Sequence, residues 1–158
     1  MPSILILFMK DDIMLKPGDN APDFFLSDAN GRKIKLSDYL GQKIALYFYP
    51  KDDTSGCTKQ ACSLRDGIGK LTRDNIIVLG ISADDEMSHK RFADKYKLPF
   101  ILLVDKDKQV CDKFIGNSML GIKRTTFLID EKGKIVKVIE KPNVEDHANE
   151  VLNCFKQP

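Results

Sequence analysis

The feature that most constrains the fold is an alternation of short apolar runs with helical patterns through the middle of the chain. Uninterrupted apolar runs of this length are typical of strands buried on both faces of a sheet. These runs cover residues 44–49, 76–81, 98–104 and 125–129. Between them, apolar residues spaced at threes and fours predict helices over 58–71, from Asp84 or Asp85 through Tyr96, and over 110–115. Such alternation predicts a mixed sheet covered by helices.

The two ends of the chain add hairpins to this core. Asn30-Gly31 lies between apolar residues at 24–26 and 34–36, which favours a hairpin closed by a tight primed turn. Ser37 is then the expected N-cap of a short turn. Residues 130–133 turn the chain from the 125–129 strand into a strand over 135–139. A last helix is expected to present the apolar residues Val144, Val151, Leu152 and Phe155.

The predicted fold class is therefore α/β, a thioredoxin-like sandwich with a mixed central sheet flanked by helices and an N-terminal β-hairpin. With 158 residues and 42% hydrophobic content, the chain is long enough for one domain with a real core. We assign that domain to residues 14–158 and treat residues 1–13 as an N-terminal extension of unknown role.

Charge and cysteine content narrow the class of protein. The 25 basic and 23 acidic residues are interleaved, so no surface for nucleic acid or an anionic membrane is expected. The apolar run at residues 4–9 is too short for a secretion signal or a membrane span. Four cysteines in a chain of this size do not suggest a secreted disulfide scaffold, and a reducing cytoplasmic location fits best.

Cys57 is the strongest candidate for a reactive residue. It follows a polar loop containing Gly56 and occupies the first turn of a predicted helix, where unpaired amides and the helix dipole favour a thiolate. A helix start after such a loop should also be partly exposed, which argues against a merely buried cysteine. Thr54 can turn its hydroxyl into the same pocket, and Pro50 removes a backbone donor beside it.

These two pocket assignments have ordinary alternatives. Thr54 is equally suited to be an N-cap, and Pro50 to end the preceding strand.

Cys62 lies five residues after Cys57, and that spacing carries a geometric consequence. In a regular helix the two Cα atoms would be about 8 to 9 Å apart. A disulfide requires less than roughly 7 Å. If the two cysteines bond, the first turns of the helix must unwind.

A metal site is the competing interpretation of the cysteine pair. Zinc sites usually combine two ligand pairs, whereas the other candidate ligands here are single: Cys111, Cys154, His89 and His147. We therefore rank redox chemistry above zinc. Cys111 and Cys154 lie on amphipathic helices, so we expect buried inert thiols, and a disulfide between them only if the fold brings them together. The two histidines are expected at the surface or as caps.

The loop also resembles a known family. The pattern Pro50-x-x-x-Thr54-x-x-Cys57 resembles the peroxiredoxins, and Cys62 narrows the resemblance to the bacterioferritin comigratory protein, or PrxQ-type, branch. Ser55 is a departure, since this branch usually has proline there. Further segments that resemble that branch occur in the expected order, at residues 16–24, 82–90, 96–100 and 124–130.

The resemblance implies a role for each of these residues. Cys57 corresponds to the peroxidatic cysteine, Cys62 to the resolving cysteine, Pro50 and Thr54 to pocket residues, and Arg124 to an arginine that contacts thiolate and peroxide. The implied substrates are hydrogen peroxide and organic hydroperoxides. A thioredoxin or glutaredoxin-like dithiol protein would reduce the disulfide, with no metal, flavin or haem, in a monomer or weak dimer.

A different class of function fits the same residues. The disulfide could serve a non-catalytic redox sensor or holdase, in which it only switches a binding surface.

Overall fold

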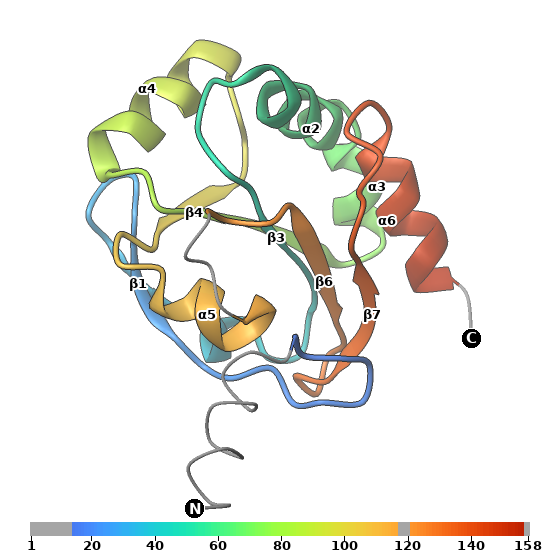
Figure 1. Ribbon diagram of the computed structural model, residues 1–158. Coiled ribbons are helices and arrows are strands. Elements are labelled where there is room, and N and C mark those ends of the chain that lie inside the picture. The colour runs from blue at the N-terminus through green and yellow to red at the C-terminus, as the bar shows by residue number, and fades with distance from the viewer. Residues whose placement is uncertain (1–13, 117–120, 157–158) are drawn as a thin grey trace, which may run out of the picture.

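The computed structural model describes residues 14–116 and 121–156. Its seven-stranded sheet has the order β2-β1-β5-β4-β3-β6-β7 (Figure 1). The strands are β1 (Phe25–Asp28), β2 (Lys33–Lys35), β3 (Lys43–Phe48), β4 (Ile76–Ser82), β5 (Ile101–Val104), β6 (Thr125–Ile129) and β7 (Ile135–Ile139). Central strands β3, β4 and β5 are parallel, whereas β6, β7 and the N-terminal hairpin pair antiparallel. The predicted mixed sheet and thioredoxin-like fold are confirmed.

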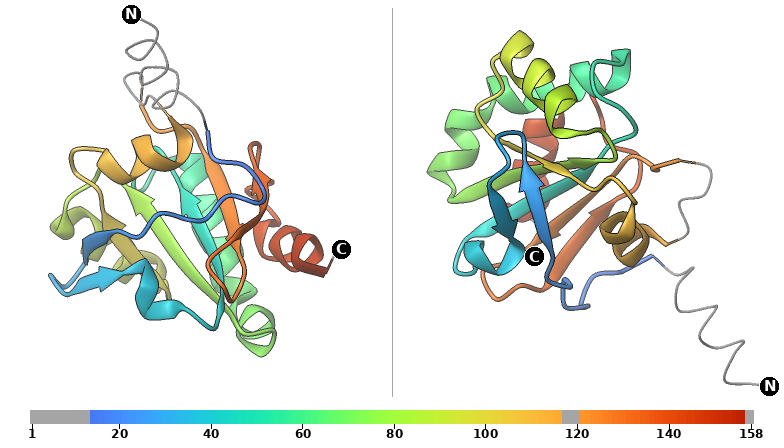
Figure 2. Two further views of the ribbon diagram at one scale, coloured as in Figure 1. Left: turned by 90° about the horizontal axis from the view of Figure 1, so that it is seen from below. Right: turned by 90° about the vertical axis from the view of Figure 1, so that its left-hand side faces the viewer.

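Helices cover both faces of this sheet. They are the 3-10 turn η1 (Leu36–Tyr39), α2 (Ser55–Asp66), α3 (Ile68–Arg73), α4 (Glu86–Tyr96), α5 (Gln109–Ile115) and α6 (His147–Lys156). Apolar residues of α2, α3, α4 and α6 join one core cluster, and those of η1 and α5 join the other. In the right view of Figure 2, α4 (yellow-green) lies on one side of the sheet and α5 (orange) on the other.

Central strand β3 divides the core, because its side chains alternate between the two faces. Ile44, Leu46 and Phe48 enter the cluster beneath α5. Ala45 and Tyr47 enter the cluster beneath α2, which also contains Cys57. The chain therefore leaves the end of β3 on the face of the sheet that α2 covers.

The structure corrects several local predictions near the N-terminus. In the hairpin turn Gly31 has a positive φ of 80° and Asn30 does not, so the turn is not of the primed type. Ser37 lies inside η1, whose N-cap is Lys35, and the Asp38 carboxylate accepts from the Lys35 amide at 3.0 Å.

The helix predicted over 58–71 is two helices. It begins earlier, at Ser55, and Gly67 separates α2 from α3. A Cβ at Gly67 would lie 2.3 Å from the Cβ of Ala148 on α6, so this glycine allows α2 and α6 to approach closely. Val144 lies ahead of α6 rather than in it.

Two further points concern the N-terminal extension and membrane-spanning helices. The extension at residues 1–13 lies outside the described residues, so its role stays a prediction. Within the described part of the chain, no helix has the length and apolar character needed to cross a membrane.

Candidate active site

Cys57 lies in the first turn of α2, as predicted. Thr54 is the N-cap, and its carbonyl accepts the first helical hydrogen bond from the Thr58 amide at 2.8 Å. The Thr54 side chain makes no capping hydrogen bond. The amides of Gly56 and Cys57 precede the helical ladder, and they point to where a ligand oxygen could accept from them.

The exposure of Cys57 was predicted wrongly. Its accessible fraction is 1%, and it packs in the cluster that contains Tyr47, Ala61 and Leu64. The prediction failed because the loop before α2 is polar in sequence, yet the Cys57 side chain that follows it packs into the core cluster. Exposure therefore cannot distinguish a reactive Cys57 from an inert one. That distinction has to come from the charged side chain beside its sulfur.

That neighbour is Arg124. Its Nη2 donates to the Cys57 Sγ at 3.4 Å, and its Nη1 donates to the Gln60 Oε1 at 2.8 Å. The antiparallel register pairs Phe48 with Thr125, which places Arg124 beside the end of β3. A cation held against the sulfur is positioned to stabilise negative charge that moves at that atom during a reaction.

Gln60 is a site residue that the sequence reasoning missed. It follows Cys57 by one helical turn on the same face of α2, it is fully buried, and it fixes the guanidinium of Arg124. A polar residue on the apolar face of the predicted helix, one turn after Cys57 and one turn before Leu64, is the sequence signal that could have identified it.

The Thr54 hydroxyl has a more restricted role than predicted. It donates to the Lys51 carbonyl at 2.9 Å, so its own proton is engaged and its lone pairs remain free to accept. Pro50 follows β3 and is exposed to solvent. Its contribution to shielding the pocket stays a prediction.

Cys62 lies in the second turn of the same continuous helix and is partly exposed. Both it and Cys57 are free thiols in this state. The helical spacing of about 8 to 9 Å between their Cα atoms thus applies to the observed structure. A bond between them requires α2 to lose its helical geometry first.

The other two cysteines lie on helices other than α2. Cys111 on α5 is buried in one core cluster, and Cys154 on α6 packs against the other, so the sheet separates them and excludes a disulfide between them. Burial raises the pKa of Cys154, as expected for an inert thiol.

The two histidines are not at the surface. His89 and His147 are both fully buried. His147 contacts the Thr126 hydroxyl at 2.8 Å and the Glu150 carboxylate at 2.7 Å. A sequence pattern places such residues on amphipathic helices but cannot reveal polar partners from distant elements.

The zinc interpretation finds no cysteine cluster in the structure. Among residues 14–116 and 121–156, the one group of three possible ligands is Asp52, Asp84 and His89, whose ligand atoms lie within 4.8 Å of one another. Hydrogen bonds among these groups and neighbouring hydroxyls account for their closeness.

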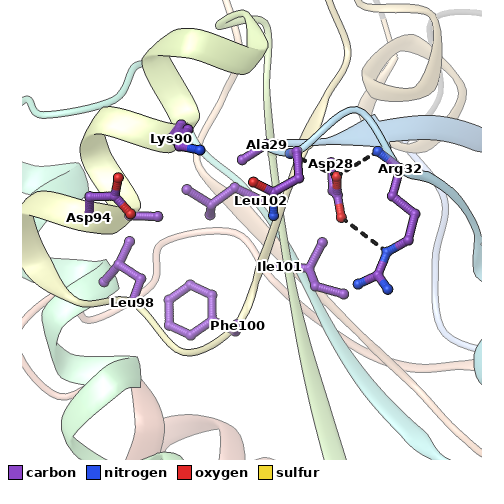
Figure 3. A pocket seen from close by; sticks show the side chains of 11 residues that line it. Asp28, Ala29, Arg32, Lys90, Asp94, Leu98, Phe100, Ile101 and Leu102 are labelled. Atoms are coloured by element: carbon purple, nitrogen blue, oxygen red, sulfur yellow. Dashed lines mark hydrogen bonds and ion pairs between the residues drawn. The ribbon is translucent and has the colours of Figure 1, made fainter.

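A separate hollow of about 240 Å³ lies between α4 and the N-terminal hairpin (Figure 3). Leu98 and Phe100 form part of its apolar wall, and Lys90 and Asp94 of α4 stand over it. It includes none of the residues around Cys57.

Comparisons with known proteins agree with this geometry. The model of the AhpC/TSA family matches residues 17–138. Peroxiredoxin Bcp of Escherichia coli strain K12 is 44% identical over 151 residues, which cover 90% of this chain and 97% of that protein.

Solved structures show the same likeness. Peroxidoxin BcpB from Mycobacterium tuberculosis superposes with a TM-score of 0.84 at 34% identity, over 90% of this chain and 97% of that one. The bacterioferritin comigratory protein of Xanthomonas campestris, described for its alkyl peroxide reduction activity, gives a TM-score of 0.79 at 29% identity, over 92% of this chain and 97% of that one.

Proposed function

Because the chain belongs to the AhpC/TSA family and is a peroxiredoxin of the Bcp type, we propose that Cys57 reduces hydrogen peroxide and alkyl hydroperoxides. The observation that carries this proposal is the contact of the Arg124 guanidinium with the Cys57 sulfur at the uncapped start of α2. The alkyl peroxide activity described for the Xanthomonas relative supports the wider substrate range.

In the first step the Cys57 thiolate attacks the terminal oxygen of the peroxide. An S–O bond forms, the O–O bond breaks, and the departing oxygen takes a proton to leave as water or an alcohol. The Thr54 oxygen would accept a hydrogen bond from the peroxide hydroxyl. The Cys57 amide and Arg124 would stabilise the negative charge that develops as the O–O bond opens.

In the second step the Cys62 thiol condenses with the Cys57 sulfenic acid, releasing water and forming a disulfide. Since both cysteines lie in α2, the helix must unwind between the two steps. A thioredoxin or glutaredoxin-like dithiol protein would then reduce the disulfide. A cytoplasmic monomer or weak dimer remains our expectation for the working state.

Two cysteine variants test the proposal in a peroxide assay coupled to a thioredoxin system. Cys57→Ser should abolish turnover, whereas Cys62→Ser should consume one equivalent of peroxide and then stall. Cys154→Ser is the matched control, because it removes a half-buried thiol from another helix and should leave turnover unchanged. Continued turnover by Cys57→Ser would overturn the assignment.

The same assay separates an enzyme from a redox sensor or holdase. Wild-type protein should consume many equivalents of peroxide per chain, and consumption that stops at one equivalent would favour the sensor.

A further inference from the structure

The short loop between β3 and α2, residues 50–54, is attached to α4 by two consecutive carboxylates. Asp52 is buried, with 7% of its surface accessible, and Asp53 is exposed. This loop carries Thr54 and leads directly into Cys57. Its position therefore decides where the first turn of α2 can form.

The Asp52 carboxylate accepts from three side chains. The Tyr49 hydroxyl donates to one oxygen at 2.5 Å, and the Ser88 hydroxyl donates to the other at 2.8 Å. The Nδ1 of His89 lies 2.7 Å from that second oxygen. Three side chains from the end of β3 and from α4 thus converge on one buried carboxylate, and both of its oxygens are engaged.

The hydrogen bonds of His89 restrict where its protons can lie. Its Nε2 contacts the Leu103 carbonyl of β5 at 2.8 Å, and a carbonyl can only accept, so Nε2 carries a proton. The short contact from Nδ1 to Asp52 needs a second proton between the two groups. A proton held on Nδ1 makes His89 an imidazolium, which is the form that its raised pKa favours.

The charges that surround His89 are consistent with this state. Burial opposes the cation, but the hydrogen bond and charge of Asp52, the Leu103 carbonyl and the charge of Asp84 together raise the pKa of His89. Asp84 follows β4 and accepts from the Asp52 amide at 2.8 Å, which joins it to the same loop. The remaining titratable group against the ring is Tyr49, whose pKa burial raises, so that it stays neutral.

Asp53 makes the second attachment. Its carboxylate accepts from the Lys95 ammonium at 2.8 Å and from the Tyr96 hydroxyl at 2.9 Å, both on the last turn of α4. Its φ of 58° lies in the left-handed region, which non-glycine residues seldom adopt. The loop is thus held against α4 at both ends of that helix.

We propose that the buried Asp52–His89 pair is a positioning device that keeps residues 50–54 fixed on α4 while α2 unwinds and refolds. This inference rests on the proposed peroxidase function, since it assigns Asp52 and His89 to the catalytic cycle of Cys57. The pair touches no reacting atom. It holds the pivot of the unwinding helix at Ser55, so that Thr54 and the Cys57 amide return to the same place after each turnover.

Hydrogen exchange measured by mass spectrometry on reduced and peroxide-oxidised protein tests the fixed pivot. Oxidation should speed exchange across α2 from Ser55 to Cys62, while the amides of residues 51–54 and of α4 keep their protection. Exchange that speeds up in the loop together with α2 would refute the pivot.

A variant tests the role of the charged pair. His89→Gln keeps a side-chain donor but removes the cation, and it should slow the single-turnover oxidation of Cys57 by roughly tenfold or more, because a displacement on the order of 1 Å can cost about a hundredfold. Lys90→Gln, on the next residue of α4 and exposed, is the matched control and should match wild type. An unchanged oxidation rate in a folded His89→Gln protein would refute the inference.

A spectroscopic readout separates this inference from the proposed function. Nitrogen NMR of the His89 ring should show two protonated nitrogens at pH 6.5 whether or not the protein consumes peroxide. A neutral His89 ring at that pH would refute the charged Asp52–His89 pair and leave the peroxidase function untouched. Wild-type protein that shows no peroxide turnover would instead refute the peroxidase function.

The raised pKa of His89 determines how the free energy of unfolding changes with pH. Because the folded pKa of His89 is raised, its stabilising contribution is complete below the unfolded value of about 6.5 and is lost as pH rises through the folded value. His89→Gln should therefore flatten this part of the profile of unfolding free energy against pH. An identical profile in the two proteins would contradict the charged pair.

Discussion

Replacing Arg124 by glutamine should slow the reaction of Cys57 with peroxide far more than it affects the fold. Arg124 is half-buried and donates to the Cys57 sulfur at 3.4 Å and to Gln60 at 2.8 Å. The substitution removes the cation and leaves Gln60 without this donor. Since the guanidinium lies at the sulfur where charge moves during the reaction, its loss acts on the transition state.

The expected decrease in the oxidation rate constant follows from the strength of hydrogen bonds to charged groups. A hydrogen bond to a charged group contributes about 1.5–3 kcal/mol. Each 1.36 kcal/mol changes a rate about tenfold, so the second-order rate constant for oxidation should fall by roughly 13-fold to 160-fold. Arg124→Lys keeps the charge but loses the two-pronged contact, and it should fall between wild type and Arg124→Gln.

Stopped-flow measurement of the loss of the Cys57 thiol under single-turnover conditions isolates this step from reduction. Lys123→Gln is the matched control, because Lys123 is adjacent, exposed and paired with Glu140 on the surface. It should react like wild type. A change of less than about threefold in a folded Arg124→Gln protein would refute the assignment of Arg124 to the transition state.

Two glycines give independent predictions. A Cβ at Gly56 would lie 2.9 Å from the Nη2 of Arg124, so Gly56→Ala should displace the guanidinium and slow oxidation with little change in melting temperature; an unchanged oxidation rate would contradict this. Gly67→Ala should overpack the contact of α2 with Ala148 and lower the free energy of unfolding in urea by about 1–3 kcal/mol, and unchanged stability would show that α6 moves freely. Tyr47→Phe removes a buried hydroxyl that has no hydrogen-bond partner among the described residues, so the thermal midpoint should rise; a fall would indicate a hidden partner for that group.

The sequence is most informative where local patterns decide the structure. The strands β3 and β4 are built on nearly continuous apolar runs, and few alternatives to a buried strand exist for them. Cys57 follows a polar loop and precedes a helical pattern, so its place in the first turn was also predictable. These features depend on residues that are close together in the chain.

Other features depend on distant contacts and could not be predicted. The break between α2 and α3 reflects the approach of Ala148 to Gly67, some eighty residues apart in the sequence. The burial of His89 depends on Asp52 and on the Leu103 carbonyl, which come from other elements. No spacing rule on a single helix signals such partners.

Arg124 could be predicted only in part. Its position follows from the antiparallel pairing of β6 with β3, which no short pattern around Arg124 reveals. The family resemblance identified it because the segment at residues 124–130 resembles that branch. The structure then supplies what the resemblance could not, namely the Gln60 contact that fixes the guanidinium.

A peptide map under non-reducing conditions, taken after one equivalent of hydrogen peroxide, tests the central claim most directly. We predict a single new cross-link between Cys57 and Cys62, with Cys111 and Cys154 recovered as free thiols. Recovery of Cys62 as a free thiol beside an overoxidised Cys57, or a cross-link of Cys57 to any other cysteine, would contradict the account.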